Sequence, residues 1–253
     1  MQIISCSNYD QLSQKLANQI AQEVKHLLKM RKKCVLVVPT GSSPRGLYEA
    51  LIPLLKDVDL ANLHIVSLDE YYPMKKTSPH SYFQEIYTLL LEPLHRANPT
   101  FRFDHAYIPN GEAPDPFKEC EQFDQKIYRL GGLDIVVLGL GVNGHIAFNE
   151  PGSRLEETTR LVQIAQSTKQ SNSRFFEHKD EVPKRAITLG LKTIVSAQNI
   201  YVIVTGESKN TIINKIMNLA EPTSAIPASY LLHHKSVFWY INEHDIHLKT
   251  ALA

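Results

Sequence analysis

The chain has 253 residues, of which 43% are hydrophobic and 21% are charged, an ordinary composition for a soluble globular protein. Its 27 basic and 26 acidic residues leave a net charge of +1, and no run of like charge is long enough to form a tail, so the charge does not indicate a nucleic-acid partner. Because the sequence shows no signal segment and no apolar run of membrane-spanning length, we expect a cytoplasmic protein without a membrane partner.

Helical and strand patterns alternate along the chain. The first is a helix over residues 7–30, where apolar residues recur at helical spacing and Ser7, followed by Asp10, can cap the start. A strand over residues 34–38 comes next, followed by a turn and a helix that begins at Pro44. Later elements are a strand over 63–68, a helix over 117–130, and strands over 134–138, 200–204 and 237–241. The helix over 117–130 has one apolar face, formed by Phe117, Cys120, Phe123, Ile127 and Leu130.

These strands are almost continuously apolar, and helices lie between them. Strands of that kind indicate a parallel sheet that is covered by helices on both faces. We find no internal repeat and no linker, so residues 1–253 are expected to form a single doubly wound, mostly parallel, Rossmann-like α/β domain. In such a sheet the ligand binds at the carboxyl ends of the strands.

The stretch LGLGVNGHIAFNEPGS, residues 138–153, contains G-x-G-x-x-G directly after a predicted strand. This pattern binds a dinucleotide when a helix begins at its third glycine and holds the pyrophosphate. Here only six residues separate Gly144 from the helix-breaking pair Pro151 and Gly152. The required acidic residue at the end of a second strand is also missing. The sequence therefore argues against a dinucleotide site.

The same stretch carries Asn143, His145 and Glu150. Glycine allows the backbone to approach a ligand closely, and an amide and a carboxylate can hold a histidine in one tautomer and tune its basicity. A lone histidine is more often a hydrogen-bonded surface or core residue. Three polar groups at one glycine-rich strand end favour a site for proton transfer.

PTGSSP follows the first strand and carries Thr40, Gly41, Ser42 and Ser43. Their hydroxyls and backbone N–H groups lie before the helix that begins at Pro44, where they can bind an anion such as a phosphate monoester. No G-K-[ST] follows, so this is not a Walker loop. Simple capping by a serine explains this stretch equally well.

Four further charged residues follow predicted strands or loops. In SLDEYYPM, Asp69 and Glu70 are adjacent, so on an extended strand end they point to opposite sides and at most one can face a cleft as a general base. Such an aspartate is also a common turn or helix cap. Arg174 in SNSRFF and Lys209 in TGESK suit a phosphate, although a single cation is more often a solvated surface charge.

The histidines and cysteines do not form a metal-site pattern. His233 with His234 and His244 with His247 are close in sequence, but no cysteine or carboxylate pattern typical of zinc accompanies them. The three cysteines are far apart, and Cys34 and Cys120 are expected to be buried thiols. The sequence indicates neither a metal nor a cofactor.

Taken together, these motifs resemble the glucosamine-6-phosphate deaminase (isomerase) family, of the glucosamine/galactosamine-6-phosphate isomerase superfamily. PTGSSP is similar to the family's phosphate loop, LDEYY with HSYF to its base-bearing segment, and GLGVNGHIAFNEPGS to its signature almost residue for residue. GEAPDPFKECEQF, SNSRFF and TGESK also have counterparts, so the resemblance covers essentially the whole chain.

The resemblance implies an enzyme that converts a 2-amino-2-deoxy-aldose 6-phosphate into fructose 6-phosphate and ammonia, without a metal or cofactor. Asp69 would move the C2 proton to C1. His145 would open the pyranose ring with support from Glu150, and the amide of Asn143 can orient the imidazole. The phosphate would be held by the loop over residues 40–43 together with Arg174 and Lys209. The implied partner is a small amino-sugar phosphate.

Two positions differ from many family members. Asn143 stands where many members carry aspartate, although asparagine also occurs in the family. In allosterically activated members, the segment that matches residues 158–163 carries an arginine and a lysine. Here Arg160 fits, but Val162 takes the place of the lysine. The resemblance therefore predicts no allosteric activation, and a monomer or small homo-oligomer.

Other functions stay open at this point. ITLGLKTI and TSAIPAS also resemble galactosamine-6-phosphate isomerases, and the sequence does not fix the C4 configuration of the sugar. The 6-phosphogluconolactonases share the fold and a Gly-His pair, but their motif lacks the F-N-E-P run. A non-catalytic sugar-phosphate sensor on this fold predicts an attached helix-turn-helix and loss of Asp69 or His145, and both residues are present.

Overall fold

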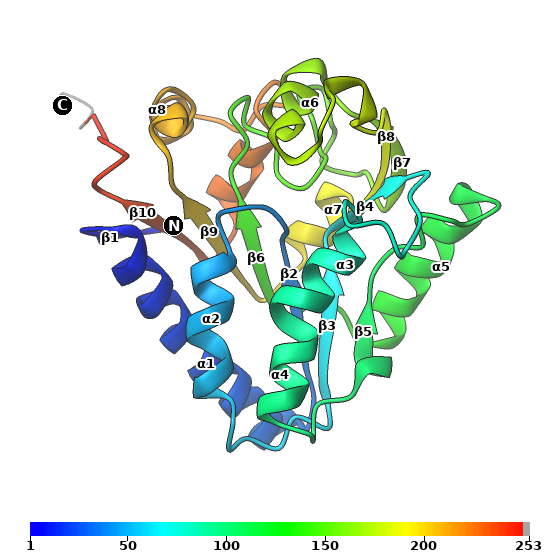
Figure 1. Cartoon of the computed structure of the whole chain (residues 1–253). Coiled ribbons are helices and arrows are strands. Elements are labelled where there is room, and N and C mark those ends of the chain that lie inside the picture. The colour runs from blue at the N-terminus through cyan, green and yellow to red at the C-terminus, as the bar shows by residue number, and fades with distance from the viewer. Residues whose placement is uncertain (250–253) are drawn as a thin grey trace.

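A seven-stranded parallel sheet forms the centre of the protein (Figure 1). The computed structural model describes residues 1–249. Along the sheet the strand order is β1-β10-β9-β6-β2-β3-β5. The strands are β1 (Gln2–Cys6), β2 (Cys34–Val38), β3 (Leu63–Ser67), β5 (Ala106–Tyr107), β6 (Ile135–Gly139), β9 (Asn199–Val204) and β10 (Val237–Asn242).

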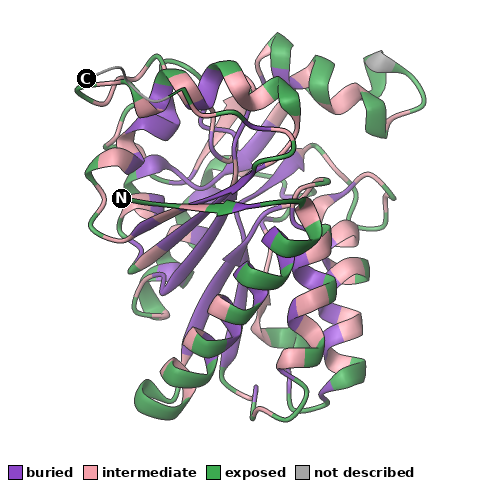
Figure 2. Ribbon diagram, turned by 90° about the vertical axis from the view of Figure 1, so that its left-hand side faces the viewer, coloured by how far each residue is buried: buried purple, intermediate pink, exposed green. Residues whose placement is uncertain are grey.

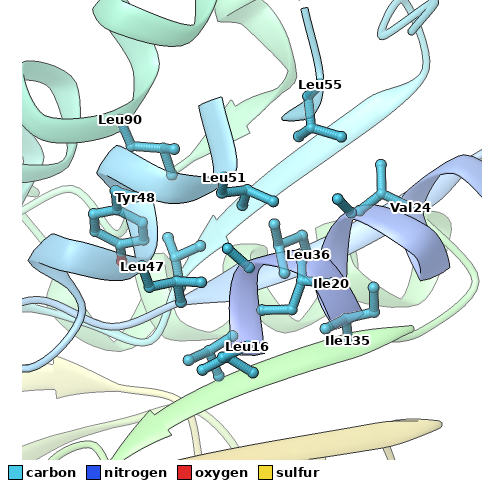
Figure 3. Packing of buried hydrophobic residues seen from close by; sticks show 14 of the residues in the cluster. Leu16, Ile20, Val24, Leu36, Leu47, Tyr48, Leu51, Leu55, Leu90 and Ile135 are labelled. Atoms are coloured by element: carbon cyan, nitrogen blue, oxygen red, sulfur yellow. The ribbon is translucent and has the colours of Figure 1, made fainter. Parts of the chain in front are cut away.

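Helices cover both faces of this sheet, because each central strand sends alternate side chains to opposite sides. Leu36 and Ile135 pack on one side against α1 (Tyr9–Arg31), α2 (Arg45–Leu54) and α4 (Glu92–Ala97), as Figure 3 shows in part. Val35 and Val136 pack on the other side against α5 (Pro116–Arg129), α7 (Leu191–Val195) and α8 (Asn210–Met217). Figure 2 shows the buried strands between the two helical layers.

Burial of these side chains stabilises the layers. The α1 residues Leu12, Leu16, Ile20 and Val24 are fully buried at a four-residue spacing. Each such side chain contributes about 1.5–3 kcal/mol when it leaves water. The long, regular apolar stripe explains why α1 is readily predicted from the sequence.

A second, three-stranded antiparallel sheet lies above the carboxyl ends of the parallel strands, close to α6 (Gln166–Asn172) in Figure 1. Its order is β4 (Asp69–Tyr72), β8 (Arg185–Thr188) and β7 (Arg160–Gln163). Leu68 joins the two sheets: its N–H donates to the Val38 carbonyl at 3.4 Å and its carbonyl accepts from the Leu189 N–H at 2.8 Å. Asp69 is therefore fixed where the chain passes from β3 into β4.

Short helical segments connect the main elements. α3 (Tyr82–Ile86) continues through a π-helical turn (Tyr87–Leu91) into α4. The 3₁₀ turns are Phe103–His105, Ser173–Phe175, Lys179–Glu181, Glu207–Lys209 and Pro227–His233. None of the helices in residues 1–249 combines the length and the apolar character needed to cross a membrane.

The predicted doubly wound α/β fold is confirmed, but three local expectations are wrong. Asn8, not Ser7, caps α1, and its Oδ1 accepts from the Gln11 N–H at 2.8 Å. The second helix begins at Arg45, after Pro44 as its N-cap. Phe117 is 67% exposed rather than part of the apolar face of α5. At 3.6 residues per turn it lies about 120° around the helix from the buried Phe123.

The strand order reverses between β2 and β6. From β2 the chain continues to β3 on one side, whereas β6 joins the opposite edge of β2. The loops after β2 and β6 therefore separate at the carboxyl end of the sheet. In open α/β sheets this switch point forms the ligand crevice.

Candidate active site

A cleft of about 760 Å³ opens at this switch point, which is a typical size for a small-molecule site. Residues that follow β2, β3, β6 and β9 line it, together with α3 and the segment around α6. The cleft brings together eight of the ten residues predicted from the sequence: Thr40, Gly41, Ser42, Ser43, Asp69, His145, Arg174 and Lys209. Asn143 and Glu150 lie directly behind His145 and bind one another.

Cations and hydroxyls gather at one end of the cleft. The Arg174 guanidinium donates to Ser42 Oγ at 3.2 Å, and Ser43 Oγ lies 3.3 Å from Thr205 Oγ1. Burial, with the nearby charge of Arg174, lowers the pKa of Lys209 to about 8. Within residues 1–249 neither cation forms an ion pair with a carboxylate. Two cations held together without an acidic partner form a site for an anion.

The loop after β2 is held in place by residues that sequence reasoning missed. The Tyr9 hydroxyl donates to the Ser43 carbonyl at 2.9 Å and accepts from the Gly46 N–H at 2.8 Å. Gly41 adopts a positive φ of 93°, a conformation that favours glycine. Its N–H donates to Glu85 Oε1 at 2.9 Å. The Gly41 amide thus already has a protein partner, whereas the Ser42 hydroxyl contacts Arg174 and the Ser43 hydroxyl contacts Thr205.

Asp69 lies buried on the cleft wall, and its neighbour Glu70 is turned away. Burial first, and then the charges of Glu70 and Glu85, raise the pKa of Asp69 well above its usual value. The Glu70 carboxylate accepts backbone N–H bonds from Tyr71, Tyr82 and Phe83 at 2.8–3.0 Å. As the alternation of a strand predicts, only one of the two carboxylates faces the cleft.

A row of hydrogen bonds orients the imidazole of His145. Asn143 Nδ2 donates to Glu150 Oε2 at 2.8 Å, so Asn143 Oδ1 is turned toward His145 Nδ1, which lies 2.7 Å away. Because that oxygen is an acceptor, Nδ1 carries the proton, and Nε2 is left to exchange a proton with a ligand. Thr168 Oγ1 lies 3.3 Å from Nδ1 and Glu150 Oε2 lies 3.4 Å from it.

Glu150 is the ionised end of this row. Burial acts to raise its pKa, but the hydrogen bond and charge of His145, with the hydrogen bonds of Thr168 and Asn143, outweigh burial and lower the pKa to about 2. The carboxylate therefore stays negative throughout the neutral range and can stabilise an imidazolium when His145 takes up a proton.

Two glycines of the G-x-G-x-x-G stretch make room for this arrangement. A Cβ at Gly141 would lie 2.3 Å from His145 Cε1 and Nδ1, so the imidazole rests directly over the Gly141 backbone. Gly144 has a positive φ of 85°, and a Cβ there would meet Ile226 Cγ2 at 2.6 Å. No helix begins at Gly144, in agreement with the rejection of a dinucleotide site; the next α-helix starts at Gln166.

The sequence also did not predict an aromatic wall beside Asp69. The rings of Tyr71 and Tyr82 lie 4.6 Å apart, and Asn172 Nδ2 donates to the Tyr71 hydroxyl at 2.9 Å. Burial raises the pKa of both phenols, that of Tyr71 to about 12. The neutral phenols lower the local polarity around Asp69. The HSYF and SNSRFF stretches contain Tyr82 and Asn172, but nothing in them shows that the two residues share one wall.

Comparison with known proteins agrees with this geometry. The family model for glucosamine-6-phosphate isomerases/6-phosphogluconolactonase matches residues 7–239. A glucosamine-6-phosphate deaminase of Clostridium botulinum (strain Loch Maree) is 36% identical over 245 residues, which cover 96% of each chain. The glucosamine-6-phosphate deaminase of Bacillus velezensis is also 36% identical, over 96% of this chain and 98% of the relative.

Two solved structures share the fold of this chain. The structure of a monomeric glucosamine-6-phosphate deaminase superposes with a TM-score of 0.90 at 33% identity, covering 97% of this chain and 98% of the other. The 6-phosphogluconolactonase of Thermotoga maritima superposes with a TM-score of 0.74 at 19% identity, over 94% and 98% of the two chains, and shows the shared fold alone. The chain therefore belongs to the family of glucosamine-6-phosphate isomerases and 6-phosphogluconolactonases, as its motifs predict.

Proposed function

We propose that the protein is a glucosamine-6-phosphate deaminase, which converts glucosamine 6-phosphate and water into fructose 6-phosphate and ammonia. One observation carries the proposal: a buried carboxylate, an oriented histidine and an anion site line a single cleft. The 36% identity to deaminases over nearly the whole chain supports the same reaction.

The anion site would hold the substrate by its phosphate. In our proposal Arg174, Lys209 and the loop over residues 40–43 bind the C6 phosphate, with Ser42 and Ser43 as hydroxyl donors. Because the C6 phosphate lies away from the reacting carbons, binding it orients the substrate and holds C1 and C2 at the other end of the cleft.

His145 would open the pyranose ring. The substrate is a cyclic hemiacetal, so a proton must leave the C1 hydroxyl while another reaches the ring oxygen. An imidazole titrates near neutrality and can do both through Nε2. Asn143 holds the other nitrogen, and the ionised Glu150 stabilises the imidazolium that forms in between.

Asp69 would then act on the open-chain sugar. Its carboxylate removes the C2 proton while the C1 aldehyde oxygen takes a proton from the substrate's ammonium group, which gives an enolamine. The carboxyl group then returns its proton to C1, which leaves an iminium at C2. Water adds to that carbon, the C–N bond breaks and ammonia leaves, so the atoms balance without a redox step. The raised pKa of Asp69 makes its carboxylate a stronger base for a carbon acid.

The proposal extends to the setting of the enzyme. We propose that residues 1–253 form one catalytic domain that works in the cytoplasm, as a monomer or small homo-oligomer, on a small sugar phosphate and with no nucleic-acid or membrane partner. The net charge of +1 and the position of the whole site within one chain support this.

A panel of substrates tests the function. We expect equal amounts of ammonia and fructose 6-phosphate from glucosamine 6-phosphate, and very slow reaction with unphosphorylated glucosamine. Galactosamine 6-phosphate tests the alternative amino sugar, and 6-phosphogluconolactone tests the lactonase branch. Hydrolysis of the lactone without release of ammonia from either amino sugar would show that the assignment is wrong.

A further inference from the structure

A second carboxylate, that of Glu85, lines the cleft and has no role in the mechanism above. It extends from α3, one helical turn after the aromatic wall residue Tyr82. Its Oε1 accepts the Gly41 N–H at 2.9 Å. In the part of the chain that the structure describes, its Oε2 accepts no hydrogen bond and no cation pairs with it.

The place of Glu85 between the two ends of the cleft limits what it can contact. Through Gly41 it adjoins Ser42 and the cationic end. Its charge also acts on Asp69 and Tyr82, which places it near the proton-transfer end. If the phosphate of a ligand lies beside Ser42 and its C2 lies at Asp69, then the carbons between them lie next to Glu85.

The chemistry of a carboxylate further limits which group of the ligand Glu85 can bind. An ionised carboxylate only accepts hydrogen bonds and repels a phosphate, so it does not help to bind the anion. The middle carbons of an amino-sugar phosphate bear hydroxyl groups, which are donors that match a free carboxylate oxygen. Such a charge-assisted hydrogen bond is short and directional. An oxygen held in place on one side by a backbone N–H can therefore discriminate between hydroxyl configurations.

We propose that Glu85 is a specificity-determining residue, whose Oε2 accepts a hydrogen bond from a hydroxyl on the C3–C4 part of the sugar and so distinguishes the two C4 configurations. This inference rests on the proposed function. It assigns the preference for glucosamine 6-phosphate over galactosamine 6-phosphate to one side chain.

The variant Glu85→Gln separates this role from support of the loop. The glutamine Oε1 can still accept the Gly41 N–H, but the second position becomes an NH₂ donor. Removing the charge also lowers the pKa of Asp69, because Glu85 raises it. That change affects both sugars equally, so it cancels in the ratio of their kcat/KM values. Glu92→Gln is the matched control, since Glu92 is outside the cleft and pairs with Arg96.

We expect the wild type to prefer glucosamine 6-phosphate, and Glu85→Gln to lower the ratio of kcat/KM between the two epimers by about tenfold or more, as loss of a charged hydrogen bond implies. Glu92→Gln should leave the ratio unchanged. Binding of fructose 6-phosphate and its C4 epimer tagatose 6-phosphate, measured by calorimetry, gives the same ratio without turnover.

Three results would overturn the inference: a wild type that prefers neither epimer, a Glu85→Gln variant that loses both substrates equally, or a variant that loses neither. The first two would leave Glu85 with at most support of the Gly41 loop. Failure of the proposed function looks different, because the wild type would then release no ammonia from either sugar, while the calorimetric ratio would still test Glu85.

Discussion

The row of Glu150, Asn143 and His145 fixes which imidazole nitrogen carries the proton. Asn143→Ala removes the acceptor 2.7 Å from Nδ1 and leaves only the longer contacts of Thr168 and Glu150, at 3.3 and 3.4 Å, to orient the ring. We expect kcat to fall about tenfold to a hundredfold, a share of what acid–base catalysis contributes, with KM little changed. Asn143→Asp retains an acceptor and should restore most of the activity. Equal kcat values for wild type and Asn143→Ala would show that this row does not serve ring opening.

We expect the half-buried Lys209 to make binding of the sugar phosphate depend on pH. A lysine is charged below its pKa and neutral above it, and here burial and Arg174 bring the pKa down to about 8. Affinity for the sugar phosphate should therefore fall as the pH rises through 8, seen as an increase in KM. Lys209→Arg keeps its charge at high pH and should flatten this dependence. A wild-type KM that stays constant through that range would contradict the assignment of Lys209 to the phosphate.

Single residues differ in how far the sequence reveals them. Asp69, His145 and Glu150 follow strands within recognisable motifs, so their place in the cleft is predictable. Glu85 and Tyr9 contact the loop over residues 40–43 from 44 and 34 residues away in the sequence, and only the packing of α3 and α1 against that loop brings them there. A local sequence pattern cannot predict a contact between residues so far apart in the chain.

At the scale of elements, the loop after β6 depends on Gly141. A methyl group there would lie 2.3 Å from the His145 ring and would push the imidazole away from its partners. We expect Gly141→Ala to lose activity by about a hundredfold or more, whereas its melting temperature changes little because a side chain, not backbone, gives way.

His145→Ala is the matched comparison, since it removes the imidazole that the methyl of Gly141→Ala would displace, and it should lower activity at least as far. Kinetics and thermal melts of both variants check the expectation. Full activity of Gly141→Ala would mean that His145 does not need its place over this glycine.

Strands and helices are predictable where burial is uniform. β2, β3, β6, β9 and β10 are almost entirely buried apolar runs, and each lies within one residue of its predicted bounds. β1 is an edge strand with mostly exposed residues, β5 has two residues, and α6 (QSTKQSN) has no apolar stripe. These elements form through strand pairing and tertiary contacts, which the hydrophobic periodicity of the sequence does not predict.

At the scale of the whole molecule, we expect an enzyme without allosteric activation. The Arg160 guanidinium donates to Asn149 Oδ1 at 2.8 Å and to Ser153 Oγ at 3.0 Å and pairs with Glu157 at 2.7 Å, so it is already engaged. Val162, in the place of a lysine, packs against the apolar cluster around Tyr71. We expect hyperbolic velocity curves with no effect of N-acetylglucosamine 6-phosphate. A sigmoidal curve that this sugar makes hyperbolic would contradict the expectation.

The central claim is that one cleft binds an amino-sugar phosphate and that Asp69 moves its C2 proton. The most direct test is to incubate glucosamine 6-phosphate with the wild type and with Asp69→Asn in heavy water, and to follow ammonia release and the C2 and C1 hydrogens by NMR. We predict ammonia and loss of the C2 hydrogen with the wild type, and neither with Asp69→Asn, which should still bind fructose 6-phosphate. Exchange at C2 at the wild-type rate in Asp69→Asn, or a wild type that releases no ammonia, would contradict the account.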